Sequence, residues 1–324
     1  MSYLPPIVSA ATTLMIILLL LRFKSHFIND IPNERSLHDV PTPRTGGMAF
    51  MLGIAGGWSF IAQLLPWWLL LPLLGLFTMS LIDDLRGLSA GIRLIGHFIA
   101  ALLVSYGIGV PWMWLFPALL FFVWMTNLYN FMDGSDGLAG GMALFGFGAY
   151  GIAALMSGND LIAMMTMSIA SATMVFLVFN FHPARIFMGD AGSIPLGFLA
   201  ACFGVWGWLQ LCWPAWFPFL VFSPFVVDAT VTMLIRLRKG ERITQPHRSH
   251  YYQRLVRNGW GHRKLALIAY LLMFVSGISA LWGMRQEVDT QAGIVMISIA
   301  AYLGMLLMAD SYCKKIEGMQ KNVG

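Results

Sequence analysis

Charged residues are scarce in this chain. Only 11% of its 324 residues are Asp, Glu, Lys or Arg, whereas an ordinary soluble domain contains about 25%. Hydrophobic residues make up 58% of the sequence, and the mean hydropathy is +0.72. These values exclude a water-soluble globular fold.

Cysteine is also rare. The three cysteines, Cys202, Cys212 and Cys313, do not have the spacing of a metal or redox motif, so we expect them to be packing residues.

A cleaved signal peptide begins with a positively charged segment, but residues 1–6 contain no Lys or Arg. The first apolar stretch is therefore expected to remain as a membrane anchor.

Long apolar runs fill most of the sequence. A membrane-spanning helix needs about 20 mostly apolar residues, and about eleven such runs can be drawn, with ten as the alternative. The expected spans are 4–21, 46–64, 67–82, 93–109, 112–126, 138–156, 161–179, 194–210, 214–235, 265–283 and 292–311. They are too continuous for barrel strands. We predict an all-α polytopic integral membrane protein, with residues 1–324 forming a single transmembrane domain.

Basic residues gather in alternate loops, and only Arg285 falls on the opposite face. Lys and Arg in short loops stay on the cytoplasmic side of the membrane. The sequence therefore predicts a periplasmic N-terminus and a cytoplasmic C-terminus. The expected cytoplasmic loops are about 22–45, 83–92, 127–137, 180–193 and 236–264.

The side chains best suited to chemistry lie in these cytoplasmic loops. In the first loop, His38 and Arg44 stand among prolines, including Pro41 and Pro43. Proline disfavours helix, so we expect a stiff, irregular segment that presents both side chains. A solvated basic turn remains the alternative.

Adjacent carboxylates follow the third apolar run, at Asp83 and Asp84. Acids near hydrocarbon are costly unless they pair with cations or bind a metal ion. A simple helix C-terminal flank is the alternative, but the helix dipole disfavours acids there. We therefore expect this pair to be functional.

Amides and carboxylates are also concentrated after the fifth run. Asn127, Asn130, Asp133 and Asp136 lie within ten residues that contain no Lys or Arg. Their oxygen atoms suit Mg²⁺, which usually shares its ligands with water and substrate phosphates. A calcium loop is the rival interpretation, but the terminal Glu of an EF-hand is missing.

The last two polar segments contain an acid and a group of cations. Asp190 precedes Ala191, Gly192 and Ser193 near an expected helix start, where free N–H groups favour anions such as phosphate, although it could also be a simple N-cap. Nine basic residues lie between positions 236 and 264, around His247, Arg248 and His250. They could grip a diphosphate, or they could contact lipid headgroups without specificity.

Taken together, these segments resemble the polyprenyl-phosphate N-acetylhexosamine-1-phosphate transferases, the membrane family that includes the phospho-N-acetylmuramoyl-pentapeptide transferases. The resemblance extends from Pro32 to about Leu255. It implies transfer of a sugar 1-phosphate from a UDP-N-acetylhexosamine to undecaprenyl phosphate, with release of UMP. It also implies Mg²⁺, for which Mn²⁺ could substitute, and the cytoplasmic face of a bacterial inner membrane. The product would begin O-antigen or another surface polysaccharide.

The resemblance also implies roles for individual residues. Asp83, Asp84, Asp190 and His247 are expected to be catalytic, with Asp190, Asn130 and Asp133 as metal ligands. The expected substrate-binding residues are His38, Arg44, Asn127, Asp136, Phe187, Arg248 and His250. The segment His-Arg-Ser-His-Tyr-Tyr departs from the family's consecutive histidines, which argues against the peptidoglycan member.

Charge neutralisation and alignment are expected to dominate such a reaction, since phosphate groups must approach one another. Asp83 or Asp84 could act as a general base, but a phosphate monoester is already largely dianionic at neutral pH, with a second pKa of about 6. We expect no nucleic-acid partner; the expected partners are the UDP-sugar, the carrier and membrane lipid, and a homodimer is compatible with the sequence.

Two rival functions remain. Asp228 and His97 lie inside apolar runs, as in an ion-coupled transporter, where intramembrane polar residues form a pathway. The acids nevertheless gather at one face, which a transporter does not explain. A structural scaffold explains neither this grouping nor the cationic loop.

Overall fold

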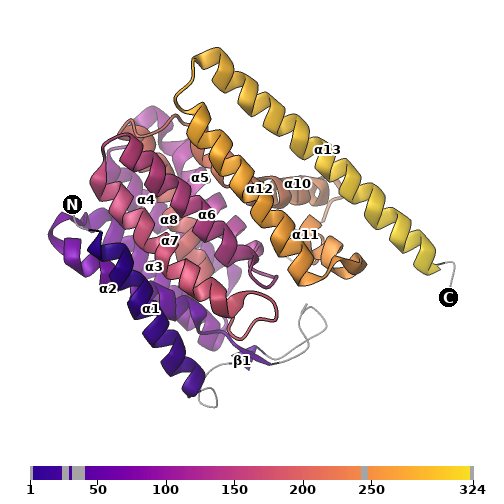
Figure 1. Cartoon of the computed structure of the whole chain (residues 1–324), viewed down its shortest axis with the longest axis horizontal. Helices are drawn as coiled ribbons and strands as arrows, with labels where there is room; N and C mark the ends of the chain where they lie inside the picture. Colours follow the sequence, from indigo (N-terminus) through magenta and orange to yellow (C-terminus); the bar gives the residue numbers. More distant parts are fainter. Residues whose placement is uncertain (1–2, 24–28, 31–40, 242–246, 322–324) are drawn as a thin grey trace.

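The computed structural model describes residues 3–23, 29–30, 41–241 and 247–321. Their helices form a bundle with one long C-terminal helix beside it (Figure 1). In chain order they are α1 (Leu4–Arg22), α2 (Gly46–Trp58), η2 (Ser59–Leu64), α3 (Trp67–Arg86), α4 (Ala90–Ile108), α5 (Trp112–Phe131), α6 (Leu138–Met156), α7 (Asp160–Asn180), α8 (Asp190–Leu209), α9 (Phe217–Val221), α10 (Ser223–Arg238), α11 (Tyr251–Leu255), η3 (Val256–Trp260), α12 (Gly261–Gly283) and α13 (Val288–Lys321). The predicted all-α polytopic membrane fold is confirmed.

Within the described residues, ten helical segments are long and apolar enough to cross a membrane. The additional span expected at 214–235 is broken into α9 and the 16-residue α10. Pro218 and Pro224 stand in the first turns of these two helices. Proline has no N–H to donate and is tolerated in a first turn, so Pro224 allows the chain to start a new helix after Phe222.

Several helices extend beyond their apolar runs toward the polar end of the bundle. The runs were expected to end at residues 82 and 126, but α3 continues to Arg86 and α5 to Phe131. Similarly, α8 begins at Asp190 and not at residue 194. The backbone hydrogen bonds of a helix continue past the first polar side chain. Asp83, Asp84, Asn127 and Asn130 are therefore helical residues.

Helix α8 is the most buried of the spans and packs against α2, α3 and α5. Its Gly197 lies directly against the backbone of α5: a Cβ atom there would approach the Met125 carbonyl oxygen to 2.7 Å and the Thr126 Cα to 2.9 Å. Glycine at this position permits close contact between the two helices.

The start of α2 is fixed to the start of α8 by backbone hydrogen bonds. Gly46 N–H donates to the Phe187 carbonyl oxygen (2.9 Å), and Gly47 N–H donates to that of Met188 (2.8 Å). Phe187 N–H donates to the Pro43 carbonyl oxygen (2.8 Å). A short antiparallel pair, β1 (Asn29–Asp30) and β2 (Thr42–Pro43), precedes this junction.

Helix α13 lies at the edge of the molecule, where it crosses α12 and α11 and leaves one long side uncovered (Figure 1). None of the residues in its most apolar window is buried.

We predict that Gly197→Ala destabilises the protein by about 1–3 kcal/mol, because the added methyl group meets backbone atoms that cannot rotate away. The measurement is the thermal midpoint of the purified protein in detergent. Gly148→Ala, in α6, is the matched control, since a Cβ atom there has no neighbour within 4 Å. Equal midpoints for the two variants would contradict the prediction.

Candidate functional site

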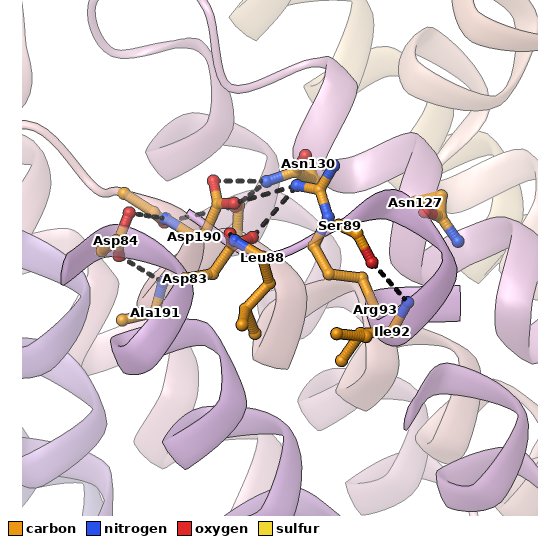
Figure 2. Close-up of polar contacts among 12 residues, drawn as sticks. Asp83, Asp84, Leu88, Ser89, Ile92, Arg93, Asn127, Asn130, Asp190 and Ala191 are labelled. Atoms are coloured by element: carbon orange, nitrogen blue, oxygen red, sulfur yellow. Dashed lines mark hydrogen bonds and ion pairs between the residues drawn. The ribbon is translucent and has the colours of Figure 1, made fainter. Parts of the chain in front are cut away.

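Three carboxylates meet where α3 reaches α8. Asp83 and Asp84 lie in the last turn of α3, and Asp190 is the first residue of α8. Asp84 accepts hydrogen bonds from the backbone N–H groups of Asp190 (3.2 Å) and Ala191 (3.0 Å). Figure 2 shows these contacts, with the Asp190 side chain turned toward α4 and α5. We call Asp83, Asp84 and Asp190 the acidic cluster.

Arg93, near the start of α4, joins two members of the acidic cluster. One terminal nitrogen of its guanidinium lies 3.1 Å from an Asp83 oxygen and 3.5 Å from an Asp190 oxygen. Asp83 also accepts a hydrogen bond from Leu88 N–H (2.6 Å). Sequence analysis did not select Arg93, because nothing local distinguishes it from the other basic loop residues; only the fold brings it to these acids.

Asn130 connects α5 to the same cluster. Its side-chain nitrogen donates to Asp190 (2.9 Å) and to the Ser193 hydroxyl (2.9 Å). Asn127, one turn earlier, donates to the Val123 carbonyl oxygen (2.7 Å) and lies 3.0 Å from Nδ1 of His97. Asn127 therefore stands apart from the carboxylates, as Figure 2 shows.

Arg44 and Gly189 lie at the other edge of the acidic cluster. The positive charge of Arg44 acts on both Asp84 and Asp190. Gly189 has a φ of +72°, and a Cβ atom on it would lie 3.0 Å from an Asp84 oxygen and 3.1 Å from the Arg44 carbonyl oxygen. Glycine is the residue that adopts such a φ without strain. This turn at Gly189 allows the next residue, Asp190, to lie beside Asp84.

The donor types at this cluster fit Mg²⁺, which prefers carboxylate and amide oxygens. Asp190 and Asn130, two of the three expected ligands, are in direct contact. The third, Asp133, lies in the turn after α5, where its N–H donates to the Asn130 carbonyl oxygen (3.2 Å). Within the described part of the chain, no group of three or more His, Cys, Asp or Glu side chains has a metal-holding arrangement.

The histidine segment, residues 247–252, forms a second polar group. The rings of His247 and His250 stack with centroids 4.9 Å apart, and Nδ1 of His247 lies 2.8 Å from the Ser249 hydroxyl. Burial, together with the positive charges of His250 and Arg236, lowers the pKa of His247 to about 4. His247 is therefore neutral at pH 7.

Arg248 lies in the same segment and has unused hydrogen-bonding capacity. Its Nε and one terminal nitrogen are buried without a hydrogen-bond partner among the residues that the structure describes. Unpaired buried donors are costly. An anionic ligand would supply the acceptors that Arg248 lacks.

A 550 Å³ cavity links these two polar groups. Its polar wall contains Arg93, Asn127, Arg236, His247, His250 and Gln253. Its apolar wall contains Leu94, Leu120, Val123, Trp124, Leu128, Phe131, Ala229 and Met233. We call it the α4–α5–α10 cavity after the helices that contribute most of its lining. It is apolar along the helices and cationic at the end where Arg93 reaches the acidic cluster.

Arg236 is the second cation that sequence analysis did not single out. It is 5% exposed, and its Nε lies 2.8 Å from a Glu241 oxygen. In the sequence it was one of nine basic residues in a loop; burial against the cavity separates it from those that face solvent.

Asp136 belongs to a different network from Asp190. One of its oxygens lies 2.7 Å from Nδ1 of His182 and accepts a hydrogen bond from Ala184 N–H (3.2 Å). Nδ1 of His262 lies 2.9 Å from the Ser135 hydroxyl, and the His182 and His262 rings stack with centroids 5.4 Å apart. Asp136 therefore contacts the segment that follows α7 and is not part of the acidic cluster.

Two further expected site residues are placed as follows. Phe187 is half-buried in the segment that precedes α8, where its backbone pairs with Pro43 and Gly46. His38 lies outside the described residues.

Comparisons with known proteins identify relatives of this chain. The sequence profile of glycosyl transferase family 4 matches residues 66–207. A probable undecaprenyl-phosphate N-acetylglucosaminyl 1-phosphate transferase of Bacillus subtilis is 31% identical over 78% of this chain and 76% of its own length. A decaprenyl-phosphate N-acetylglucosaminephosphotransferase of Mycobacterium tuberculosis is 30% identical, with 87% and 83% covered.

A phospho-N-acetylmuramoyl-pentapeptide-transferase of Moorella thermoacetica is 28% identical, over 74% of this chain and 84% of the relative. The profile match covers α3 to α8 and therefore includes the whole acidic cluster. The resemblance inferred from the motifs is confirmed. The chain belongs to glycosyl transferase family 4, the membrane enzymes that transfer phosphosugars to polyprenyl phosphates.

Proposed function

We propose that this enzyme transfers N-acetylhexosamine-1-phosphate from a UDP-sugar to undecaprenyl phosphate and releases UMP. The reaction would take place on the cytoplasmic face of a bacterial inner membrane and would initiate O-antigen or another surface polysaccharide. The observation that carries the proposal is the α4–α5–α10 cavity, whose apolar wall suits a lipid chain and whose cationic end suits a phosphate.

The geometry supports a short path between carrier and donor. A carrier whose chain lies along Leu94, Leu120 and Met233 would place its phosphate beside His247 and Arg236. Arg93 lines the same cavity and contacts Asp83 and Asp190. It therefore provides a cation between the carrier phosphate and the donor diphosphate, where negative charge accumulates during transfer.

Asp190, with Asn130, is proposed to hold Mg²⁺, or Mn²⁺ in its place. When bound, the metal ion would neutralise charge on the donor diphosphate. Ser193 orients Asn130 through a 2.9 Å hydrogen bond, and Asp84 holds the first two N–H groups of α8. These contacts fix Asp190 on a rigid helix start, so little reorganisation accompanies the reaction.

Asp83 and Asp84 are proposed to act by position and charge. Asp84 already accepts two backbone hydrogen bonds, and Asp83 accepts one from Leu88 N–H and lies within hydrogen-bonding distance of Arg93. A carrier phosphate that is largely dianionic at neutral pH needs no base, since its second pKa is about 6. Deprotonation by either acid is therefore unnecessary.

The proposed orientation, with the N-terminus outside and the C-terminus inside, follows from the positive-inside rule and would put the acidic cluster on the cytoplasmic face. The acidic cluster, the cavity and His247 all come from one chain. The proposal assigns every role to side chains of one chain and is compatible with a homodimer.

The decisive experiment is UMP release by the purified protein with Mg²⁺, undecaprenyl phosphate and a panel of UDP-N-acetyl-sugars, including GlcNAc, FucNAc and QuiNAc donors. We expect release with one donor, and a loss of at least about 10²-fold in Asp190→Ala, because a carboxylate next to the transferred charge is removed. Asp289→Ala, an exposed acid at the start of α13, is the control. Ion-driven uptake into proteoliposomes without UMP release would instead support a transporter.

Arg236→Ala is predicted to raise the KM for undecaprenyl phosphate by about 10- to 100-fold, since a charge-assisted contact to phosphate contributes roughly 1.5–3 kcal/mol. The KM for the UDP-sugar should stay within about twofold. Initial rates at varied concentrations of each substrate give both constants. Equal increases in the two constants would argue against a carrier site at Arg236.

Asp83→Asn separates a positional role from general base catalysis. If Asp83 acts by position, the variant has a lower rate at every pH between about 6 and 9, with the wild-type profile shape. If Asp83 is the base, its activity should recover as pH rises and the carrier phosphate loses its last proton unaided. Parallel pH–rate profiles of the two proteins distinguish these results.

A further inference from the structure

Asp228 is a buried acid that the proposed reaction does not use. It lies in the middle of α10 and is 7% exposed. A carboxylate at such a position is costly unless several donors surround it. Its contacts therefore indicate what it holds in place.

Four donors surround Asp228. Oδ1 accepts hydrogen bonds from Tyr251 N–H (3.0 Å) and the Thr232 hydroxyl (3.2 Å), and lies 3.2 Å from Nδ1 of His250. Oδ2 accepts a hydrogen bond from Tyr252 N–H (2.9 Å). Three of these four groups belong to consecutive residues of the histidine segment, so one side chain of α10 holds the segment's backbone and its ring.

The contact with His250 also determines which ring nitrogen carries a proton. A carboxylate that receives N–H and O–H groups acts as an acceptor, so Nδ1 of His250 must be the donor. Nε2, on the opposite side of the ring, is then turned away from Asp228. His250 lines the α4–α5–α10 cavity and stacks between His247 and Tyr252, with ring centroids 4.9 and 5.8 Å away.

We propose that Asp228 is a positioning residue that orients His250, and with it His247, toward the phosphate of the lipid carrier. This inference rests on the proposed function, since it assumes that the cationic end of the cavity takes that phosphate. Asp228 does not line this cavity, whose described α10 residues are Ala229, Met233 and Arg236; it acts through the histidine segment.

Asp228→Asn keeps the side-chain size but replaces one acceptor oxygen with a donor that faces an N–H group. We expect the Kd and the KM for undecaprenyl phosphate to rise by about tenfold or more, because hydrogen bonds to a charged group are lost. The KM for the UDP-sugar should change less than about twofold. Asp228→Glu, which restores a carboxylate, should recover part of the carrier affinity.

Asp310→Asn is the matched control. Asp310, on α13, contacts the same short helix from its other side: it accepts a hydrogen bond from the Tyr251 hydroxyl (3.1 Å) and pairs with Arg254 (2.6 Å). Removing this charge should leave the carrier KM unchanged. A carrier KM raised as much as in Asp228→Asn would mean that general loosening of α11 is responsible, and would overturn the inference.

A double variant tests whether Asp228 acts through His250. If it does, the double variant Asp228→Asn/His250→Gln should bind the carrier as tightly as the single variant that has the lower carrier affinity. Losses that multiply would show independent effects and would overturn the positioning role. Thermal midpoints within a few degrees of wild type confirm that each variant is folded.

Direct binding of undecaprenyl phosphate to the detergent-solubilised protein separates this inference from the proposed function. UMP release by the wild type with unchanged carrier affinity in Asp228→Asn would overturn the inference alone. Carrier binding that is lost in Asp228→Asn, without UMP release from any donor, would overturn the proposed reaction alone. Absence of both carrier binding and UMP release in the wild type would overturn both.

Discussion

The two hydrogen bonds from the start of α8 to Asp84 hold the candidate site together. A helix start has free N–H groups and a partial positive charge, and an acid from a neighbouring helix satisfies both. Here Asp84 is that acid, so α3 and α8 are joined at the point where Asp190 emerges. Asn130 and Arg93 then reach Asp190 from α5 and α4. Without the Asp84 hydrogen bonds, the start of α8 would not be held against α3, and Asp190 would have no fixed position relative to Asn130 and Arg93.

The sequence predicted which polar side chains are unusual better than it predicted which of them contact one another. Asp83, Asp84, Asn130 and Asp190 could be selected because polar residues at the ends of apolar runs are costly without a purpose. These residues could be expected to lie near one another, because helices of similar length end at the same face of a membrane. The grouping of Asp136 with His182 could not be predicted, since it depends on how the turn after α7 folds back.

The residues that sequence analysis passed over share one property: their role depends on what the fold places beside them. Arg93 and Arg236 look like ordinary loop cations until the fold places them beside a cavity. Asp228 was recognised as unusual, but three of its four partners are 22 to 24 residues away in sequence. Helix ends were misjudged for a related reason: an apolar run marks where lipid contact ends, whereas the helix ends where its backbone hydrogen bonds do.

The break between α9 and α10 leaves α10 too short to cross the hydrocarbon layer alone. A 16-residue helix is about 24 Å long at 1.5 Å per residue, which is shorter than the roughly 30 Å hydrocarbon layer. The end of α10 that lines the cavity through Arg236 can therefore lie within the thickness of the membrane. A long-chain lipid could then react without leaving the bilayer. Each methylene that remains in the hydrocarbon avoids about 0.8 kcal/mol of exposure to water, so the short helix makes extraction of the lipid unnecessary.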